Sequence, residues 1–149
     1  MSKIAVCSIA VLAAAGAQTP NAFDKAPPNV SEALKARVKD FYQDHVEGKY
    51  RKAEALVASD SKDGFYAATK PALQEFHLGD IVYSDHYTKA KVTVVGKMMI
   101  SFLGMAGPQL MDVPFPSYWK LENRKWVWYI YQDPNRMTPF GKANGKSQG

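Results

Sequence analysis

The alternation of apolar and polar side chains after residue 89 constrains the fold of this chain more than any other feature. Between Ala90 and Phe102 every second residue is apolar or small, and the residues between them are mostly lysine, threonine or serine. A period of two is that of a β-strand, whose successive side chains point to opposite faces of a sheet. The segment therefore predicts a strand with one face against a core and the other toward solvent.

Two hairpins extend this strand into a four-stranded antiparallel meander. Residues 76–84 precede it, and Asp85-His86 are suited to a two-residue turn that would join the two segments. The second hairpin joins residues 117–121 to residues 125–131 through Asn123-Arg124. In that register Trp119 faces Trp128, so both indole rings lie on one face of the sheet.

Proline limits the second hairpin. In the register just described, the even-numbered residues of its first strand direct their N–H groups toward its second strand. Pro114 and Pro116 have no N–H to donate. The pairing of these two strands is therefore expected to weaken near Pro116.

The chain before Leu73 has helical rather than strand spacing. Ser31 is placed to cap a first helix, whose apolar residues recur every three or four positions until Gly48 ends it. A shorter helix is expected from Tyr50 to Ala58, then a polar break at residues 59–64 and one more helical turn at residues 65–69. Two or three helices followed by an antiparallel sheet predict an α+β domain, with the helices packed on one face.

The first seventeen residues are typical of a cleavable signal peptide. Lys3 gives a basic start, residues 4–17 are apolar or small, and Ala15-Gly16-Ala17 resembles a cleavage site. We expect residues 1–17 to be removed, residues 18–30 to form a linker, residues 31–137 one domain and residues 138–149 a flexible tail. The mature chain would then be exported, to a periplasm or the exterior, with no membrane association.

The charge of the chain gives little reason to expect a nucleic-acid partner. The formal net charge is +5, but acidic residues are interleaved with the lysines and no basic cluster alternates with aromatic residues. The single cysteine, Cys7, lies in the expected leader. Thiol chemistry is therefore excluded from the mature form.

The order of these elements resembles the nuclear-transport-factor-two-like superfamily, which includes SnoaL-like and ketosteroid-isomerase-like proteins. Residues 60–66, 81–85 with 89–92, and 118–122 with 125–129 carry the resemblance, which extends over residues 31–133. It implies a cone-shaped α+β roll, in which a curved sheet wraps the first helix and leaves a cavity at the mouth. A cystatin-like arrangement of helix and sheet is the nearest alternative.

A histidine or an aspartate is the expected polar group inside that cavity. If Asp85-His86 are the turn, His77 pairs with Val94 and lies on the apolar face, whereas a register slip by one residue places Asp80 there instead. Of the three histidines only His77 is a good candidate for the cavity, since His45 falls at the margin of the helical stripe and His86 in a turn. Between His77 and Asp80 we favour His77. Either His77 or Asp80 could act as a general base with a pKa shifted by burial.

Phenol, thioether and indole side chains would complete the cavity. Trp119 and Trp128 form either an aromatic wall or ordinary core packing. The residues predicted to line a ligand cavity are Tyr42, Tyr66, His77, Tyr83, Met98, Trp119 and Trp128. The sequence has no His-x-x-x-His pair, phosphate-cradling glycine loop or dinucleotide fingerprint, so no metal ion and no cofactor is expected.

The opposite face of the last hairpin is too aromatic for a surface that meets only water. It carries Tyr118, Val127, Tyr129 and Tyr131. Since such a face is normally more polar, we expect it to be covered by a second copy of the chain, a partner domain or the tail.

The leading functional hypothesis is an exported, non-catalytic module that binds a small apolar ligand or a protein partner. The superfamily supports enzymes, binding proteins and assembly modules on one scaffold, so the resemblance does not select among them. The alternatives are a small lyase, isomerase or hydrolase with a histidine or aspartate base in the cavity, and a structural homodimeric assembly module.

Overall fold

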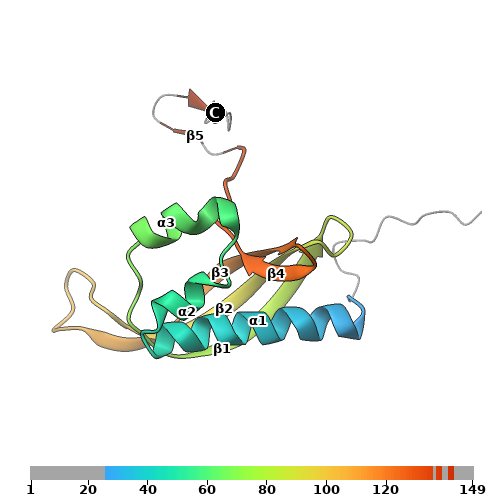
Figure 1. Ribbon diagram of the computed structural model, residues 1–149. Coiled ribbons are helices and arrows are strands. Elements are labelled where there is room, and N and C mark those ends of the chain that lie inside the picture. The colour runs from blue at the N-terminus through green and yellow to red at the C-terminus, as the bar shows by residue number, and fades with distance from the viewer. Residues whose placement is uncertain (1–25, 136, 139–140, 143–149) are drawn as a thin grey trace, which may run out of the picture.

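The computed structural model describes residues 26–135, 137–138 and 141–142 of the 149-residue chain. The expected signal peptide, the linker up to residue 25 and most of the expected tail lie outside the described residues. Within the described part, three α-helices and a 3-10 turn precede a four-stranded antiparallel sheet (Figure 1). The predicted α+β class and order of elements are confirmed.

The first helix, α1 (Pro28–Val46), begins earlier than the sequence suggested. The cap is Pro27 rather than Ser31, and the carbonyl of Pro27 accepts hydrogen bonds from the backbone N–H groups of Val30 and Ser31, both 3.0 Å. Pro28 takes the first helical position, where its fixed φ suits the helix and its missing N–H is not needed. Residues 28–30 therefore belong to the helix and not to a linker.

The helices after α1 also differ from the expectation. The second, α2 (Tyr50–Glu54), ends four residues before Ala58. The expected polar break is helical instead, because η1 (Ser59–Ser61) leads directly into α3 (Lys62–Ala67). Gly64 permits this arrangement, since a Cβ at that position would collide with the side chain of Ile130.

The sheet has the order β1-β2-β3-β4, with each strand antiparallel to its neighbour. Its strands are β1 (Leu73–Ser84), β2 (Lys89–Ile100), β3 (Gln109–Glu122) and β4 (Lys125–Trp128). The sheet curves around α1, and the connection between β2 and β3 projects away from the helices (Figure 1). After β4 in the chain, β5 (Met137–Thr138) and β6 (Gly141–Lys142) form a separate two-stranded sheet.

The predicted placement of His77 is wrong, and a β-bulge is the reason. The turn between β1 and β2 contains four residues, not two, which shifts the pairing but leaves the faces unchanged. Farther along, Leu78 pairs with Val94 and Ile81 with Val92, so two residues of β1 oppose one of β2. The extra residue reverses the faces, directing Phe76 and Leu78 inward and His77 outward.

Asp80, the alternative candidate, lies in the bulge itself. Both Asp80 and His77 are exposed to solvent. Neither register considered from the sequence included a bulge. Gly79, an isolated glycine within a strand pattern, is the residue that could have indicated one.

The predicted register of the second hairpin is confirmed. Trp119 pairs with Trp128 and Leu121 with Trp126, so both tryptophans of the first pair lie on the inner face. The regular pairing ends at Trp128, and one more hydrogen bond, from the N–H of Tyr129 to the carbonyl of Tyr118 at 3.0 Å, follows before Pro116 is reached. From there the backbone N–H of Ile130 donates to the hydroxyl of Ser61 at 3.1 Å instead of continuing the sheet.

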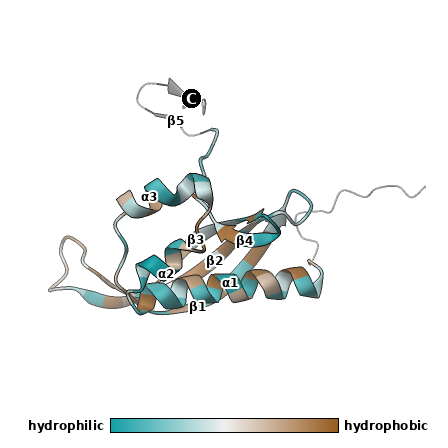
Figure 2. Ribbon diagram, in the orientation of Figure 1, coloured by the Kyte–Doolittle hydropathy of each residue, from teal (hydrophilic) through white to brown (hydrophobic). Residues whose placement is uncertain are grey.

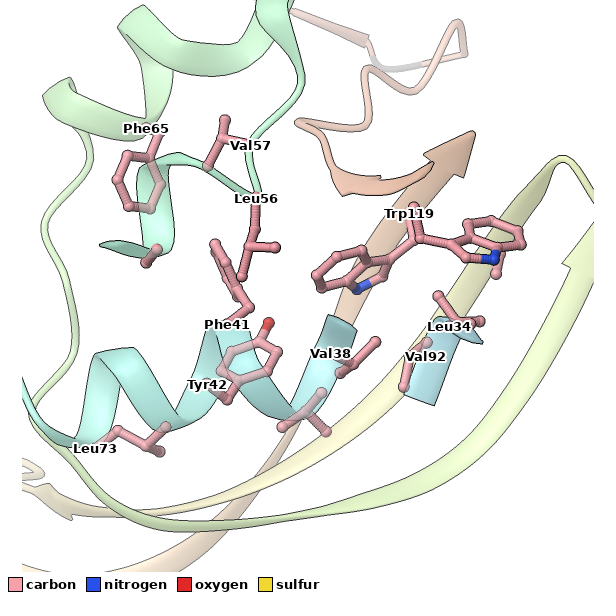
Figure 3. Packing of buried hydrophobic residues seen from close by; sticks show 14 of the residues in the cluster. Leu34, Val38, Phe41, Tyr42, Leu56, Val57, Phe65, Leu73, Val92 and Trp119 are labelled. Carbon is pink, nitrogen blue, oxygen red and sulfur yellow. The ribbon is translucent and has the colours of Figure 1, made fainter. Parts of the chain in front are cut away.

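The core lies between α1 and the inner face of the sheet. Hydropathy alternates along α1 in Figure 2, as expected for a helix with one buried face. Leu34 and Val38 of α1 are fully buried, as are Val92 and Trp119 of the sheet (Figure 3). Among the described residues, no helix is both long and apolar enough to cross a bilayer.

Candidate functional site

A cavity of about 220 Å³ opens where the C-terminal half of α1 meets α3 and the start of β1. The segment from Ala68 to Pro71 forms its rim, and side chains from α1, α3, β1, β3 and β4 form its walls. The residues that line it are Phe41, Tyr42, His45, Phe65, Ala68, Thr69, Lys70, Pro71, Leu73, Phe115, Pro116 and Trp128. The cavity thus lies at the open end of the curved sheet, as the roll architecture implies.

Aromatic rings dominate the walls. Phe41 stacks on Trp128 with ring centroids 5.6 Å apart and meets Trp119 edge-on at the same distance. Phe41 therefore lies against both indoles, and it connects the cavity wall to the core. Phe65 from α3 contacts Phe41 and Trp128, each at 6.0 Å between centroids.

His45 is the histidine that lines the cavity. Its side chain is buried, and Nδ1 lies 2.8 Å from the carbonyl oxygen of Phe41. Because a carbonyl only accepts, Nδ1 carries the proton and donates it, which leaves Nε2 as an acceptor. No described residue forms a hydrogen bond with Nε2.

The surroundings of His45 favour its neutral form. Burial lowers the pKa of His45, and the positive charge of Lys70 acts in the same direction, while the hydrogen bond to Phe41 opposes them. A neutral imidazole with a free Nε2 can accept a hydrogen bond or a proton from a bound molecule.

Lys70 lies at the rim of the cavity. Its ammonium group donates hydrogen bonds to the carbonyls at the end of α3, those of Phe65, Ala68 (3.0 Å) and Tyr66 (3.4 Å). It also lies 4.3 Å from the centroid of the Phe65 ring. Lys70 thus combines helix capping with a cation–π contact and places a positive charge beside His45.

Tyr42 lines the cavity and is itself held by the core. Its hydroxyl donates to Ser117 Oγ at 2.8 Å, and Trp119 Nε1 donates to the same oxygen at 2.9 Å. Burial raises the pKa of Tyr42 to about 12, so the phenol stays protonated. These hydrogen bonds fix the floor of the cavity.

Only two of the seven residues predicted to line a cavity do so. Tyr42 and Trp128 are in its wall, whereas His77 and Tyr66 face solvent, the latter with 57% of its surface exposed. Trp119 is fully buried behind Phe41 and does not stack directly on Trp128. The remaining two, Tyr83 and Met98, are buried elsewhere in the core.

Most residues of the cavity were not predicted from the sequence. His45 follows Phe41 by four residues on the buried stripe of α1, and this spacing was the available indication of its position. Lys70 and Pro71 had no such pattern, because a loop brings them to the rim.

No group of three or more His, Cys, Asp or Glu side chains that could bind a metal ion occurs among the described residues. Of the catalytic candidates, His77 and Asp80 lie apart from the cavity. The one imidazole and one ammonium at the cavity give it chemistry suited to hydrogen bonding and proton transfer.

Neither the protein-family models nor the curated proteins gave a match to this chain. A solved structure that is similar is described as a "putative polyketide cyclase" from Xanthomonas campestris pv. campestris. The two chains are 12% identical, the similarity covers 68% of this chain and 93% of the other, and the TM-score is 0.40.

Proposed function

We propose that this protein binds a small, ring-shaped apolar molecule in the cavity beside His45, and that it does so as a member of the nuclear-transport-factor-two-like superfamily. The observation that carries the proposal is an aromatic cavity that contains one hydrogen-bond acceptor not used by any described residue, His45 Nε2. Ligand sites generally combine apolar walls with a few convergent polar groups. At about 220 Å³ the cavity is smaller than most drug-sized sites, so it suits one or two rings.

The preferred ligand would carry a hydrogen-bond donor. A phenolic O–H group or an amide N–H group could donate to Nε2, while the ring packs against Phe65 and Trp128. A ligand that covers Nε2 without donating a hydrogen bond would leave this acceptor unmatched, so an otherwise identical hydrocarbon should bind less tightly.

Titration with 1-naphthol and with naphthalene tests this proposal. Quenching of tryptophan fluorescence should report binding, because Trp128 is in the wall of the cavity. Naphthol should bind about tenfold more tightly than naphthalene, and His45→Ala should remove most of that difference. Ala68→Phe at the rim should weaken both ligands, whereas the matched control Ala36→Phe, on the exposed face of α1, should not. Equal binding by both rim and control variants would contradict a site in this cavity.

A second candidate is a proton-transfer enzyme that uses His45 rather than His77 or Asp80 as its base. The free Nε2 and the lowered pKa of His45 favour this possibility. The base would remove a proton from carbon beside a carbonyl, forming an enolate and an imidazolium, and then return a proton to that carbon. Hydrogen–deuterium exchange of 2-indanone in D₂O measures this step. Catalysed exchange that His45→Gln abolishes would favour the enzyme, and exchange at the buffer rate would reject it for this substrate.

We further propose that the protein acts after export. The basic start and apolar run of residues 1–17 support this. N-terminal sequencing of the protein isolated from its own host should find Gln18 as the first residue. An intact Met1 would contradict the proposal.

We propose that a homodimer forms through one surface, made by the outer face of β3 and by the chain that follows β4. Tyr118 stacks on Tyr131 with centroids 4.7 Å apart, and 46% of the surface of Tyr131 is exposed. Sedimentation should show a dimer that Tyr131→Asp dissociates. The control Tyr66→Asp alters a tyrosine that is even more exposed, at 57%, and should leave the dimer intact. A monomer at every concentration would reject this surface.

A further inference from the structure

A second concavity, which shares no residue with the cavity beside His45, runs between α1 and β1. We call it the α1–β1 groove; its volume is about 710 Å³. Its walls include Lys35, Lys39 and Gln43 from α1, and Phe76, His77 and Leu78 from β1. The groove is thus bounded on one side by a helix and on the other by the first strand of the sheet (Figure 1).

The two edge strands of the sheet differ in the hydrogen bonding of their outer edges. At β4, the segment Leu56–Ala58 occupies the outer edge: the N–H of Ala58 donates to the carbonyl of Trp128 at 2.7 Å, and the N–H of Trp128 donates to the carbonyl of Leu56 at 2.8 Å. At β1, the backbone bonds only to β2, and no other described residue forms a hydrogen bond with the outer edge. An edge of this kind offers unpaired N–H and C=O groups to another extended segment.

The regular part of this edge that borders the groove is short. Shifts in register occur between Leu73 and Glu75 and between Leu78 and Ile81, so the four residues from Glu75 to Leu78 form an unbroken stretch. Within it Phe76 and Leu78 are half-buried and direct their side chains toward α1, as their pairing with Gly96 and Val94 requires. The groove therefore has room for a brief extended segment with an apolar floor beneath it.

The helical wall of the groove is basic. Lys35 and Lys39 are four residues apart, on the same side of α1, and both are exposed. Neither forms an ion pair with a described residue. Asp40 is the one acidic side chain in the lining, and the chain as a whole has a net charge of +5. The complement of this wall is an acidic segment.

We propose that the α1–β1 groove binds a short, extended peptide segment with acidic side chains, which joins the sheet as an additional strand beside β1. The backbone of the segment would pair with residues 75–78. Its acidic side chains, on the face toward α1, would pack their methylene groups against Phe76 and Leu78 and place their carboxylates near Lys35 and Lys39. The alternate, apolar side chains would point to the opposite face. Recognition of this kind obtains affinity from the main chain and specificity from alternate side chains. It does not depend on the function of the cavity beside His45.

A fluorescein-labelled hexapeptide of alternating glutamate and valine, with blocked ends, is a suitable probe. Fluorescence anisotropy with the full chain should show saturable binding. The double variant Lys35→Glu, Lys39→Glu should weaken it by about tenfold or more, and the matched control Lys91→Glu, Lys125→Glu by less than about twofold. Equal weakening by both double variants would indicate nonspecific charge attraction and would overturn the proposal.

Amide hydrogen exchange separates strand addition from binding by charge alone. The peptide should protect amides within residues 75–78, and the same peptide N-methylated at alternate residues should neither bind nor protect. Binding without protection of β1, or binding that survives N-methylation, would overturn the proposal. So would protection of β1 that increases with protein concentration in the absence of peptide, since the occupant would then be a second copy of the chain.

Discussion

The two ends of α1 face the same sheet but are packed in different ways. Toward its N-terminus, Leu34 and Val38 are fully buried, in the same core as Trp119 and Trp126. Toward its C-terminus, the same helical stripe borders a cavity of about 220 Å³. Since the side chains at the open end are as large as those at the closed end, the cavity does not result from small residues.

The difference originates in β4. β4 pairs with β3 as far as Trp128, and the N–H of Tyr129 adds one more hydrogen bond, to the carbonyl of Tyr118. The next bonded pair would require an N–H from Pro116, which has none. The chain instead turns toward α3, where Ile130 donates to Ser61. Loop and helix residues, not another strand segment, therefore enclose the open end.

Replacing each of the two paired indoles, of which Trp119 is enclosed in the core and Trp128 borders the cavity, gives the largest expected contrast. Trp119→Ala should lower the free energy of unfolding by about 3–5 kcal/mol, because a fully buried side chain is lost. Trp128→Ala removes a half-buried side chain that borders existing space, and we expect about 1–3 kcal/mol. Urea denaturation followed by circular dichroism measures both. Equal losses would mean that the open end is packed as tightly as the closed one.

A methyl group added under the cavity should have an intermediate effect. A Cβ at Gly96 would collide with the side chain of Leu73 and approach Phe115 to 3.0 Å, and both of these residues line the cavity. We expect Gly96→Ala to lower the free energy of unfolding by about 1–3 kcal/mol through overpacking.

The double variant Gly96→Ala, Leu73→Ala provides the control for this effect. Removing the Leu73 side chain relieves the collision, so the double variant should be more stable than the sum of the two single changes indicates. Strict additivity in urea denaturation would show that the collision is not the cause.

Much of the fold could be predicted from local patterns in the sequence. The wrong placement of side chains on β1 comes from a break in such a pattern. The alternation along β2 and the turn at Asn123-Arg124 specified the pairing of both tryptophans correctly. The position of His77 was wrong because one extra residue at a bulge reverses every side chain beyond it. Alternation identifies the faces of a strand only while the pairing remains regular.

The cavity was less predictable than the fold. His45 and Phe41 could be placed on the buried side of α1 from their spacing. The approach of Phe65 and Lys70 depends on how α3 lies across the open end, which involves contacts distant in sequence. No period in the sequence encodes such contacts.

Protonation of His45, which lies at the open end, should make the stability of the protein depend on pH in the mildly acidic range. Burial lowers the pKa of His45 below its ordinary value of 6.5, so the unfolded chain binds a proton that the folded protein resists. Stability should therefore decline as the pH falls from about 6.5 to the folded-state pKa, and change no further from this cause below it.

Urea denaturation of the wild type and of His45→Gln across this range measures the contribution. The variant should lose the decline. The control His77→Gln replaces an exposed histidine and should retain it. The carboxylates of Asp60, Asp85, Glu47, Glu75 and Glu122, whose pKa values are lowered by lysine or serine partners, act in a more acidic range. An unchanged decline in His45→Gln would show that another group is responsible.

Restoring an N–H at the end of the sheet should have the smallest effect on stability. Pro116→Val could add a hydrogen bond worth about 1 kcal/mol, but greater freedom of the unfolded chain would offset about 0.4–1 kcal/mol of it. The net change should fall within about 0.5 kcal/mol. Hydrogen exchange should nevertheless reveal protection of the amide at position 116. An amide there that exchanges freely would show that proline is not what ends β4.

The bulge at Gly79 and Asp80 makes the effect of a deletion in β1 depend on how many residues are removed. On either side of it, the hydrophobic pattern is displaced by one position, so the two halves of the strand obey opposite parities. Deleting either bulge residue would make the strand regular and keep Phe76 and Leu78 on the inner face with Ile81 and Tyr83, because the bulge compensates for that one extra residue. Deleting both residues would leave the two halves out of phase with no bulge between them, burying His77 and expelling Phe76 and Leu78. Loss of one bulge residue should therefore be tolerated far better than loss of both.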